Sequence, residues 1–248
     1  MWIKHPTEMN CSQTTIKMSK EKRPVTALFS FPGSGNTWTR HLIEYTSGVA
    51  TGSVYCATSL IPVFIGECHV KDVIVIKSHE GNNRVKFEKA IVLIRSPYRS
   101  IISFFNYRYS RGHNQTGFAS KDDFERLFEG FAITNIQQWR GNNLGWLQFK
   151  GPKCVVFYEE LLQNTVSELK KMNNFLNVTV ADTTYSCLLK NIEGDYHRSY
   201  KSLTFNPMQY YTRKLNVTIE NAIKQVEEKV AYVTGNNHNI KRFTSVLK

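Results

Sequence analysis

The amino-acid sequence predicts an α/β fold, in which a central parallel sheet carries helices on both faces as a three-layer α/β/α arrangement. Short runs of β-branched and apolar residues, each closed by polar or turn-forming residues, recur along the 248-residue chain. Between and after these runs lie segments whose apolar residues repeat every three or four positions. Strands that alternate with helices in this way are typical of a parallel sheet.

The expected elements follow in chain order. Buried strands are expected at residues 25–31, 72–77, 89–94 and 153–158. Amphipathic helices are expected at residues 37–46, 97–111, 131–149, 165–176 and 218–232. The second helix has the clearest start, because Ser96 is a favourable N-cap and Pro97 suits the first helical position.

The domain organisation is expected to be simple. Residues 1–23 are polar and are expected to form a flexible N-terminal lead-in. Residues 24–248 are expected to form one domain, because no internal repeat and no linker rich in Pro, Gly or Ser interrupts them. Residues 112–120 are the expected mobile loop.

The chain is basic, with 32 Lys and Arg against 20 Asp and Glu and a formal net charge of +12. This balance favours nucleic acid, phosphate or sulfate esters, acidic glycans or an anionic membrane face as partners, although a basic solvated surface explains it equally well. No apolar run approaches the roughly 18 residues of a membrane span, and the N-terminus has no apolar signal core. A membrane anchor is therefore expected only upstream of Met1.

The five cysteines show no CxxC spacing, which argues against a structural zinc site. Cys56 and Cys68 are the closest well-separated pair and the candidate for one disulfide, although nothing in the sequence requires it. Asn-x-Ser/Thr sequons, which would matter only in the secretory pathway, occur at Asn10, Asn114, Asn177 and Asn216.

The first candidate site is the loop FPGSGNTW, which leaves the first strand and opens the first helix. Its glycines let the backbone approach a phosphate closely, and its N–H groups together with the helix N-terminus form an anion cradle. The expected cradle residues are Gly33, Ser34, Gly35, Asn36, Thr37 and Trp38. The GxxxxGK[ST] pattern of ATP-binding loops is absent, so the loop suits an anion held without a metal ion. A purely structural turn is the plainer alternative.

Polar residues also follow two other predicted strands. Arg95 ends the third strand and Ser103 lies eight residues later, where a guanidinium and a hydroxyl can share one phosphate. Lys77 and His79 end the second strand, and a histidine there can take a proton from an alcohol near neutral pH. Each has a structural alternative, but ligands bind at the carboxyl ends of strands in open α/β sheets, where all of these residues are expected.

Taken in order, these clusters resemble the sulfotransferases that use 3′-phosphoadenosine 5′-phosphosulfate (PAPS), which have a P-loop-NTPase-like fold. FPGSGNTW is similar to the family's 5′-phosphosulfate loop, and IRSPYRSIISFF to its 3′-phosphate signature. IKSH is similar to the strand end that carries the catalytic base, and FYEEL, with Tyr158, to the family's tyrosine-acid segment. The resemblance covers residues 25–162 well and the remainder weakly.

The resemblance implies transfer of a sulfuryl group from PAPS to a hydroxyl, with PAP as product and no metal. His79 is then the general base, Lys77 offsets charge on the sulfonate, and Arg95 with Ser103 binds the 3′-phosphate. Within the family, the stretch FPGSGNTWTRHLIEYTSG resembles the WSC-domain-containing sulfotransferases. This resemblance implies a carbohydrate acceptor, with sialic acid as the candidate, and no nucleic-acid partner. It also implies a glycoprotein of the Golgi lumen or membrane. A chain complete as given would instead be cytoplasmic.

Two departures from the family pattern stand out. The family loop carries a lysine after the proline, where this chain has Gly33, and Lys77 or Arg40 is the expected substitute. The family's C-terminal basic segment that binds the 3′-phosphate is represented only by Arg198, Lys201 and Arg213.

Three alternatives remain open on the sequence. A P-loop-like nucleotide kinase or NTPase would need the missing GK[ST] and an acidic Mg²⁺ ligand at a strand end. A non-enzymatic protein that binds PAP, nucleic acid or an acidic glycan would rely on the basic charge. A degenerate family member would bind PAP and transfer nothing.

Overall fold

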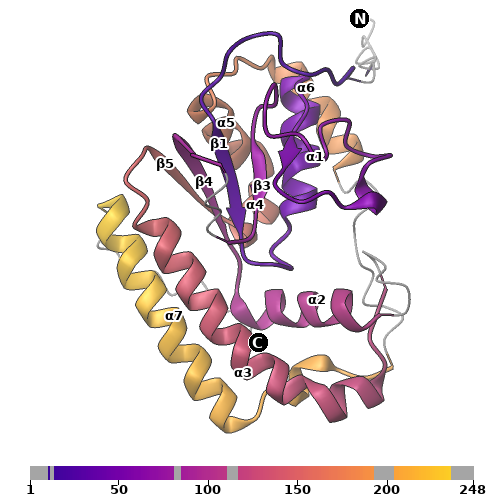
Figure 1. The fold of residues 1–248 in the computed structure, drawn as a ribbon, viewed down its shortest axis with the longest axis vertical. Helices are drawn as coiled ribbons and strands as arrows, with labels where there is room; N and C mark the ends of the chain where they lie inside the picture. Colours follow the sequence, from indigo (N-terminus) through magenta and orange to yellow (C-terminus); the bar gives the residue numbers. More distant parts are fainter. Residues whose placement is uncertain (1–10, 12–13, 81–84, 111–116, 193–203, 236–248) are drawn as a thin grey trace, which may run out of the picture.

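A five-stranded sheet forms the centre of the computed structural model, which describes residues 11, 14–80, 85–110, 117–192 and 204–235 (Figure 1). Its strands are β1 (Thr26–Ser30), β2 (Gly52–Ser53), β3 (Ile76–Ser78), β4 (Lys89–Ile94) and β5 (Lys153–Phe157). They lie in the order β2-β3-β1-β4-β5, and every pairing is parallel. Because β1 lies between β3 and β4, the carboxyl ends of these three strands meet at one edge of the sheet.

Helices cover both faces of this sheet, which confirms the three-layer α/β/α class (Figure 1). The helices are α1 (Asn36–Ser47), α2 (Pro97–Tyr109), α3 (Lys121–Leu147), α4 (Tyr158–Gln163), α5 (Thr165–Phe175), α6 (Asp182–Leu188) and α7 (Arg213–Thr234), with short 3₁₀ turns η1 (Thr58–Leu60), η3 (Leu189–Asn191) and η6 (Pro207–Tyr210). Side chains of α2, α3 and α7 pack on one face, and side chains of α1, α5 and α6 on the other.

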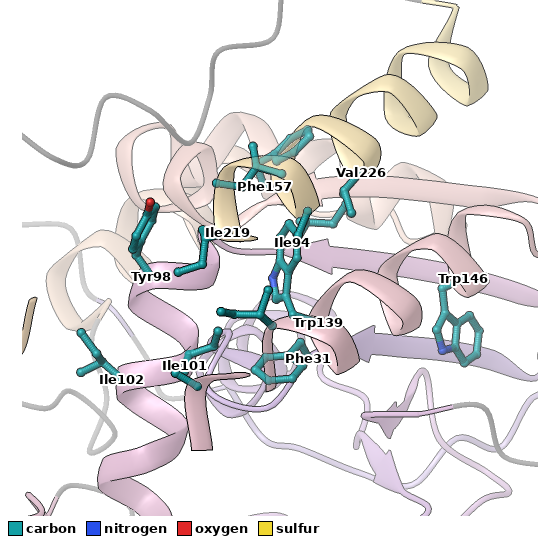
Figure 2. Close-up of a cluster of buried hydrophobic side chains, with 14 of the residues drawn as sticks. Phe31, Ile94, Tyr98, Ile101, Ile102, Trp139, Trp146, Phe157, Ile219 and Val226 are labelled. Carbon is teal, nitrogen blue, oxygen red and sulfur yellow. The ribbon is translucent and has the colours of Figure 1, made fainter. Parts of the chain in front are cut away.

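Side chains of β1 alternate between the two layers of core. Ala27 and Phe29 join the cluster formed with α2, α3 and α7, part of which Figure 2 shows around Trp139. Leu28 joins the cluster formed with α1, α5 and α6. A strand covered on both faces is apolar over most of its length, which is why β1, β4 and β5 could be recognised from their apolar runs.

The predicted strand at 72–77 is wrong over most of its length, because only Ile76–Ser78 pairs as β3. Residues 73–75 are buried, as their apolar character requires, but Asp72 has a φ of +58° and turns the backbone out of a strand conformation. The Ile74 N–H instead donates to the Ala50 carbonyl beside β2. The apolar pattern therefore extended the predicted strand beyond the residues that pair as β3.

The predicted helix boundaries differ most for α3, which begins at Lys121 and not at 131. Ser120 and Asp123 form a capping box at its start, in which the Ser120 hydroxyl accepts from the Asp123 N–H and the Asp123 carboxylate accepts from the Ser120 N–H. Ser120, the last residue of the predicted mobile loop, is therefore the N-cap of α3. Residues 112–116 of that loop lie outside the described part of the chain. Helix α7 also begins earlier than predicted, and β2, α4 and α6 were not predicted.

The predicted lead-in is partly tied to the domain. Cys11 forms a disulfide with Cys187, and Lys17 pairs with Val49 in a parallel bridge. The flexible lead-in therefore does not extend over the described residues from 14 onward. The candidate disulfide Cys56–Cys68 is present, whereas Cys11–Cys187 was not predicted. No helix in the described ranges has both the length and the apolar character needed to span a bilayer.

Candidate functional site

The loop between β1 and α1 lies at the centre of the candidate site. Gly33 and Gly35 have φ angles of +77° and +88°, a region that glycine adopts without strain. A Cβ atom at Gly33 would lie 2.3 Å from the Ser100 carbonyl oxygen, and one at Gly35 would lie 2.4 Å from the Tyr158 ring. Both positions therefore require glycine, because α2 and Tyr158 hold the loop from either side.

The start of α1 is open to an anion. Its N-cap, Gly35, supplies no side-chain cap, and the first turn contains no acidic residue. The Ser34 hydroxyl is buried and has no hydrogen-bond partner within the described residues. Uncapped N–H groups, a helix dipole and an orphaned hydroxyl suit a phosphate group.

The Asn36 side chain is turned away from the predicted cradle, to which the sequence assigned only its backbone N–H. Its side-chain amide donates to the Leu28 carbonyl at 3.0 Å and to the Ser30 hydroxyl at 3.2 Å. The Asn36 side chain therefore fastens α1 to β1, and its backbone N–H is the part that remains at the helix start.

His79 follows β3 and contacts the end of β1. Its Nδ1 lies 2.8 Å from the Ser30 carbonyl oxygen, which can only accept, so Nδ1 carries the proton and Nε2 keeps the lone pair. Burial, followed by the positive charge of Lys77, lowers the His79 pKa to about 3. The imidazole is therefore neutral at physiological pH, as a proton acceptor must be.

Lys77 is 8% exposed and lies in β3, paired with Leu28 of β1. Burial, followed by the charge of Arg40, lowers its pKa to about 8, and Glu67 acts in the opposite direction. A buried cation whose charged form is this costly would be stabilised by a bound anion.

Arg95 and Ser103 both approach Gly33. The Arg95 guanidinium donates from Nη1 to the Gly33 carbonyl at 2.8 Å, and its Cζ lies 4.1 Å from the centre of the Tyr158 ring. Its buried Nε has no hydrogen-bond partner among the described residues. The Ser103 Cβ lies 3.1 Å from where a Gly33 Cβ would be. The two residues predicted to share a phosphate thus flank one glycine of the loop.

The remaining predicted residues have mixed placements. The rings of Trp38 and Tyr158 meet edge to face at 5.6 Å, and the Trp38 indole donates to the Ile192 carbonyl at 2.7 Å. Thr37 is half-buried in the first turn of α1. Arg198 and Lys201 lie outside the described residues.

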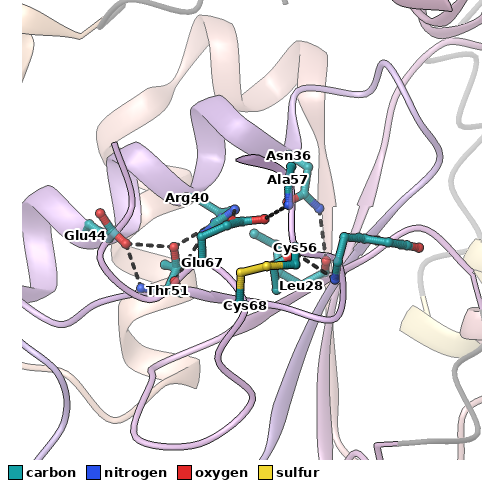
Figure 3. A network of polar contacts seen from close by, with 11 residues as sticks. Leu28, Asn36, Arg40, Glu44, Thr51, Cys56, Ala57, Glu67 and Cys68 are labelled. Atoms are coloured by element: carbon teal, nitrogen blue, oxygen red, sulfur yellow. Dashed lines mark hydrogen bonds and ion pairs between the residues drawn. A yellow bond between two sulfur atoms is a disulfide. The ribbon is translucent and has the colours of Figure 1, made fainter. Parts of the chain in front are cut away.

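Arg40 cannot substitute for the missing loop lysine, which corrects the prediction (Figure 3). Its side chain is fully buried, and its Nη1 lies 2.6 Å from the Glu67 carboxylate. Its Nε and Nη2 donate to the hydroxyl and carbonyl of Thr51 at 2.7 and 3.1 Å. Every arm of this guanidinium is engaged, so among the two expected substitutes only Lys77 remains.

Two residues that contact His79, Tyr55 and Asn142, had no signal in the sequence. The Tyr55 hydroxyl accepts from the His79 backbone N–H at 3.1 Å, and the two rings stack with centroids 5.5 Å apart. The Asn142 side chain donates to the His79 carbonyl at 3.1 Å. These partners lie 24 and 63 residues away in the chain, beyond the reach of any local pattern.

The chain is similar to several known proteins. A family model described as a sulfotransferase domain matches residues 75–231. The chain is 35% identical over 206 residues to WSCD family member CG9164 of Drosophila melanogaster, which is 79% of this chain and 63% of that protein. It is 36% identical over 217 residues to WSCD family member AAEL009094 of Aedes aegypti, which is 84% of this chain and 67% of that protein. The chain therefore spans about two thirds of the length of these relatives.

A solved structure shows the same fold. Mouse sulfotransferase SULT7A1, complexed with PAP, superposes with a TM-score of 0.58 over 88% of each chain, at 16% sequence identity.

Proposed function

Because this chain belongs to the sulfotransferase family, we propose that it transfers a sulfuryl group from PAPS to an acceptor hydroxyl. One observation carries the proposal: the last residue of β1 and the short loop after it contact three of the predicted groups. His79 contacts Ser30, Arg95 contacts Gly33, and the Tyr158 ring covers Gly35. The groups proposed to bind phosphate and the group proposed to accept the proton therefore approach the same end of β1.

The donor would bind through its two phosphate ends. The N–H groups from Ser34 to Trp38 and the orphaned Ser34 hydroxyl would hold the 5′-phosphosulfate. Arg95 and Ser103 would hold the 3′-phosphate beside Tyr158, with Arg198 and Lys201 as further contacts. The guanidinium is partly immobilised by Gly33 and Tyr158, so it loses little side-chain freedom on binding.

The reaction proposed is an in-line displacement at sulfur. The acceptor oxygen bonds to sulfur as the bond from sulfur to the PAP phosphate oxygen breaks, and Nε2 of His79 takes the acceptor proton. Lys77 offsets the negative charge that gathers on the sulfonate and on the departing PAP. Because bound PAPS brings several negative charges, it raises the pKa of His79 from its low value toward the range useful for a base.

The acceptor is proposed to be a carbohydrate hydroxyl, with sialic acid on a glycan as the specific candidate, and the compartment to be the Golgi. The net charge of +12 suits an acidic glycan. The two disulfides suit an oxidising compartment. Two sequons lie within the described residues. Asn177 is exposed and is the better candidate for glycosylation, because the Asn216 side-chain amide already donates to the Tyr211 carbonyl.

The test is transfer from radiolabelled PAPS to a panel of glycans, each sialylated glycan paired with its desialylated form, in the presence of a chelator. Wild-type protein is expected to label a carbohydrate, and His79→Ala to lose transfer while its PAP affinity stays within about twofold. Arg126→Ala, at an exposed pair on α3, is the control and should behave as wild type. Absence of both PAP binding and transfer would refute the proposal, and full activity of His79→Ala would remove the base.

A further inference from the structure

We propose that Tyr55 is a positioning residue for His79 and that the Cys56–Cys68 disulfide, with the buried Arg40–Glu67 pair, holds Tyr55 in place. The inference rests on the proposed role of His79 as the base. The inference predicts that the Cys56–Cys68 disulfide increases kcat, so that the oxidised protein is the active form.

Tyr55 restrains His79 through two separate contacts. Its hydroxyl accepts from the His79 backbone N–H at 3.1 Å, and its ring stacks on the imidazole with the planes tilted by 27°. On the other side, Nδ1 of His79 donates to the Ser30 carbonyl at 2.8 Å. One hydrogen bond alone leaves a ring free to swing about it, whereas a stacked neighbour removes that freedom and fixes the direction of Nε2.

Tyr55 itself does not act as an acid or base in this arrangement. Burial is the largest cause that raises its pKa above the ordinary value of a phenol, so the hydroxyl stays neutral at physiological pH. Its contribution is position and the exclusion of water from one face of the imidazole.

The chain before Tyr55 is fixed by the edge of the sheet. β2 pairs with β3, and the Val54 N–H continues this pairing by donating to the Lys77 carbonyl at 3.1 Å. The Tyr55 N–H donates to the Ser53 hydroxyl at 3.0 Å. Tyr55 thus leaves β2 beside the residues that lead to His79.

The chain after Tyr55 is fixed by the network in Figure 3. Cys56 is bonded to Cys68, and the Ala57 N–H donates to the Glu67 carboxylate at 3.3 Å. The other oxygen of Glu67 accepts from Arg40 at 2.6 Å. Arg40 belongs to α1, the helix whose N-terminus forms the cradle, so donor binding and the position of Tyr55 share one support.

The loop closed by this disulfide is packed from inside. Phe64 is 2% exposed, and the guanidinium carbon of Arg40 lies 3.9 Å from the centre of its ring. Glu44 fixes Thr51 by accepting from both its N–H and its hydroxyl, at 2.7 and 2.8 Å. The chain on both sides of Tyr55 is thus held at several points, which keeps its ring in place, and loss of the disulfide removes the covalent one.

The first experiment compares Tyr55→Leu and Tyr55→Phe with wild type, using PAPS and a glycan from the panel that wild type labels. Tyr55→Leu is expected to lose roughly 10–100-fold in kcat, a part of the 10²–10⁴ that general base catalysis supplies, with PAP affinity and the KM for PAPS within about twofold. Tyr55→Phe keeps the stacked ring and should lose only about fivefold, the effect of one hydrogen bond. Tyr232→Leu, at a tyrosine 79% exposed on α7, is the matched control.

The second experiment compares two double variants. Cys56→Ser/Cys68→Ser should lose kcat as Tyr55→Leu does, and the loss should persist at temperatures where circular dichroism shows the protein folded. Cys11→Ser/Cys187→Ser removes the other disulfide and should keep kcat at saturating PAPS, although it lowers the unfolding temperature.

The outcomes separate the two levels of inference. If wild type transfers sulfate and His79→Ala does not, yet Tyr55→Leu keeps its kcat or loses kcat and PAP affinity together, the positioning role is wrong and the proposed function stands. Equal kcat losses in the two disulfide variants would overturn the part given to Cys56–Cys68. Should wild type bind no PAP and transfer nothing, the proposed function itself fails.

Discussion

Lys77→Met is expected to make the ligand-free protein more stable while it destroys turnover. Lys77 is 8% exposed, and burial is the first cause that lowers its pKa from 10.5 to about 8. Methionine has similar length and no charge, so it fills the space of the lysine stem without a group that needs solvation.

The size of the effect follows from the shift in pKa. From 10.5 to about 8 is about 2.5 units, and at about 1.4 kcal/mol per unit the charged amine costs the folded state up to about 3 kcal/mol. The folded state binds protons less tightly than the unfolded state, so stability rises with pH between about 8 and 10.5. The cost is therefore fully present below pH 8, where the variant should gain most.

The assay is thermal unfolding at pH 7 and at pH 10.5, without and with PAP. For a chain of this size about 3 kcal/mol corresponds to roughly 6–12 °C, so Lys77→Met should unfold at a higher temperature by up to that amount at pH 7. The gain should nearly vanish at pH 10.5. PAP should stabilise wild type more than the variant, and kcat should fall on the order of 10²–10³-fold.

Lys224→Met, at an exposed lysine of α7, is the matched control and should change neither stability nor kcat appreciably. A Lys77→Met protein that is less stable than wild type at pH 7 would show that the buried charge is well compensated. A variant with normal kcat would show that Lys77 has no part in transfer.

Other changes test neighbouring parts of the structure. Gly33→Ala should lower the free energy of unfolding in urea by about 2 kcal/mol or more, because its φ is +77° and α2 leaves no room for a Cβ. Gly130→Ala, in open space on α3, is the control and should stabilise the protein. A Gly33→Ala variant as stable as wild type would mean that the family lysine could also fit. Arg40→Ala should lower the free energy of unfolding by about 3–5 kcal/mol, because it leaves the buried Glu67 carboxylate without its partner. Arg126→Ala, at an exposed pair, should lower it by less than about 1 kcal/mol. Equal losses in the two variants would contradict the importance of the buried pair. In pH profiles, kcat/KM should fall above about pH 8, where Lys77 of the free enzyme loses its proton. The fall in kcat should occur at higher pH, because bound anions stabilise the charged lysine. A kcat/KM profile that is flat to pH 10 would exclude a role for the Lys77 charge.

Local sequence patterns predicted β1, β4, β5 and the glycine-bearing loop, but missed β2 and placed most of the strand at 72–77 wrongly. β4 was predicted at its observed boundaries, Lys89–Ile94, because a strand covered on both faces is apolar over most of its length and ends where polar residues begin. The loop was proposed as an anion cradle from its glycines, and both glycines have a positive φ. That Arg95 and His79 both reach the end of β1 and the loop after it follows from topology, because their strands both neighbour β1.

What the sequence did not predict depends on pairing between distant residues. Arg40 and Glu67 are 27 positions apart, and nothing in the residues around either shows that one neutralises the other. Tyr55 is one tyrosine among 12 until the fold stacks it on His79. The error at 72–75 has a similar origin, because the apolar pattern reports burial. The turn at Asp72 has a distant partner, since the Ser19 N–H donates to the Asp72 carbonyl.

The central claim is that the ends of β1, β3 and β4 hold a nucleoside with two phosphate groups and need no divalent cation. Calorimetric titration of PAP and of adenosine 5′-phosphate in the presence of a chelator, into wild type and Arg95→Ala, tests it most directly. Wild type should bind PAP more tightly than the monophosphate by roughly 10–100-fold, the effect of charge-assisted hydrogen bonds to one phosphate, and Arg95→Ala should lose most of that preference. Equal affinity of wild type for the two nucleotides, or an unchanged preference in Arg95→Ala, would contradict it.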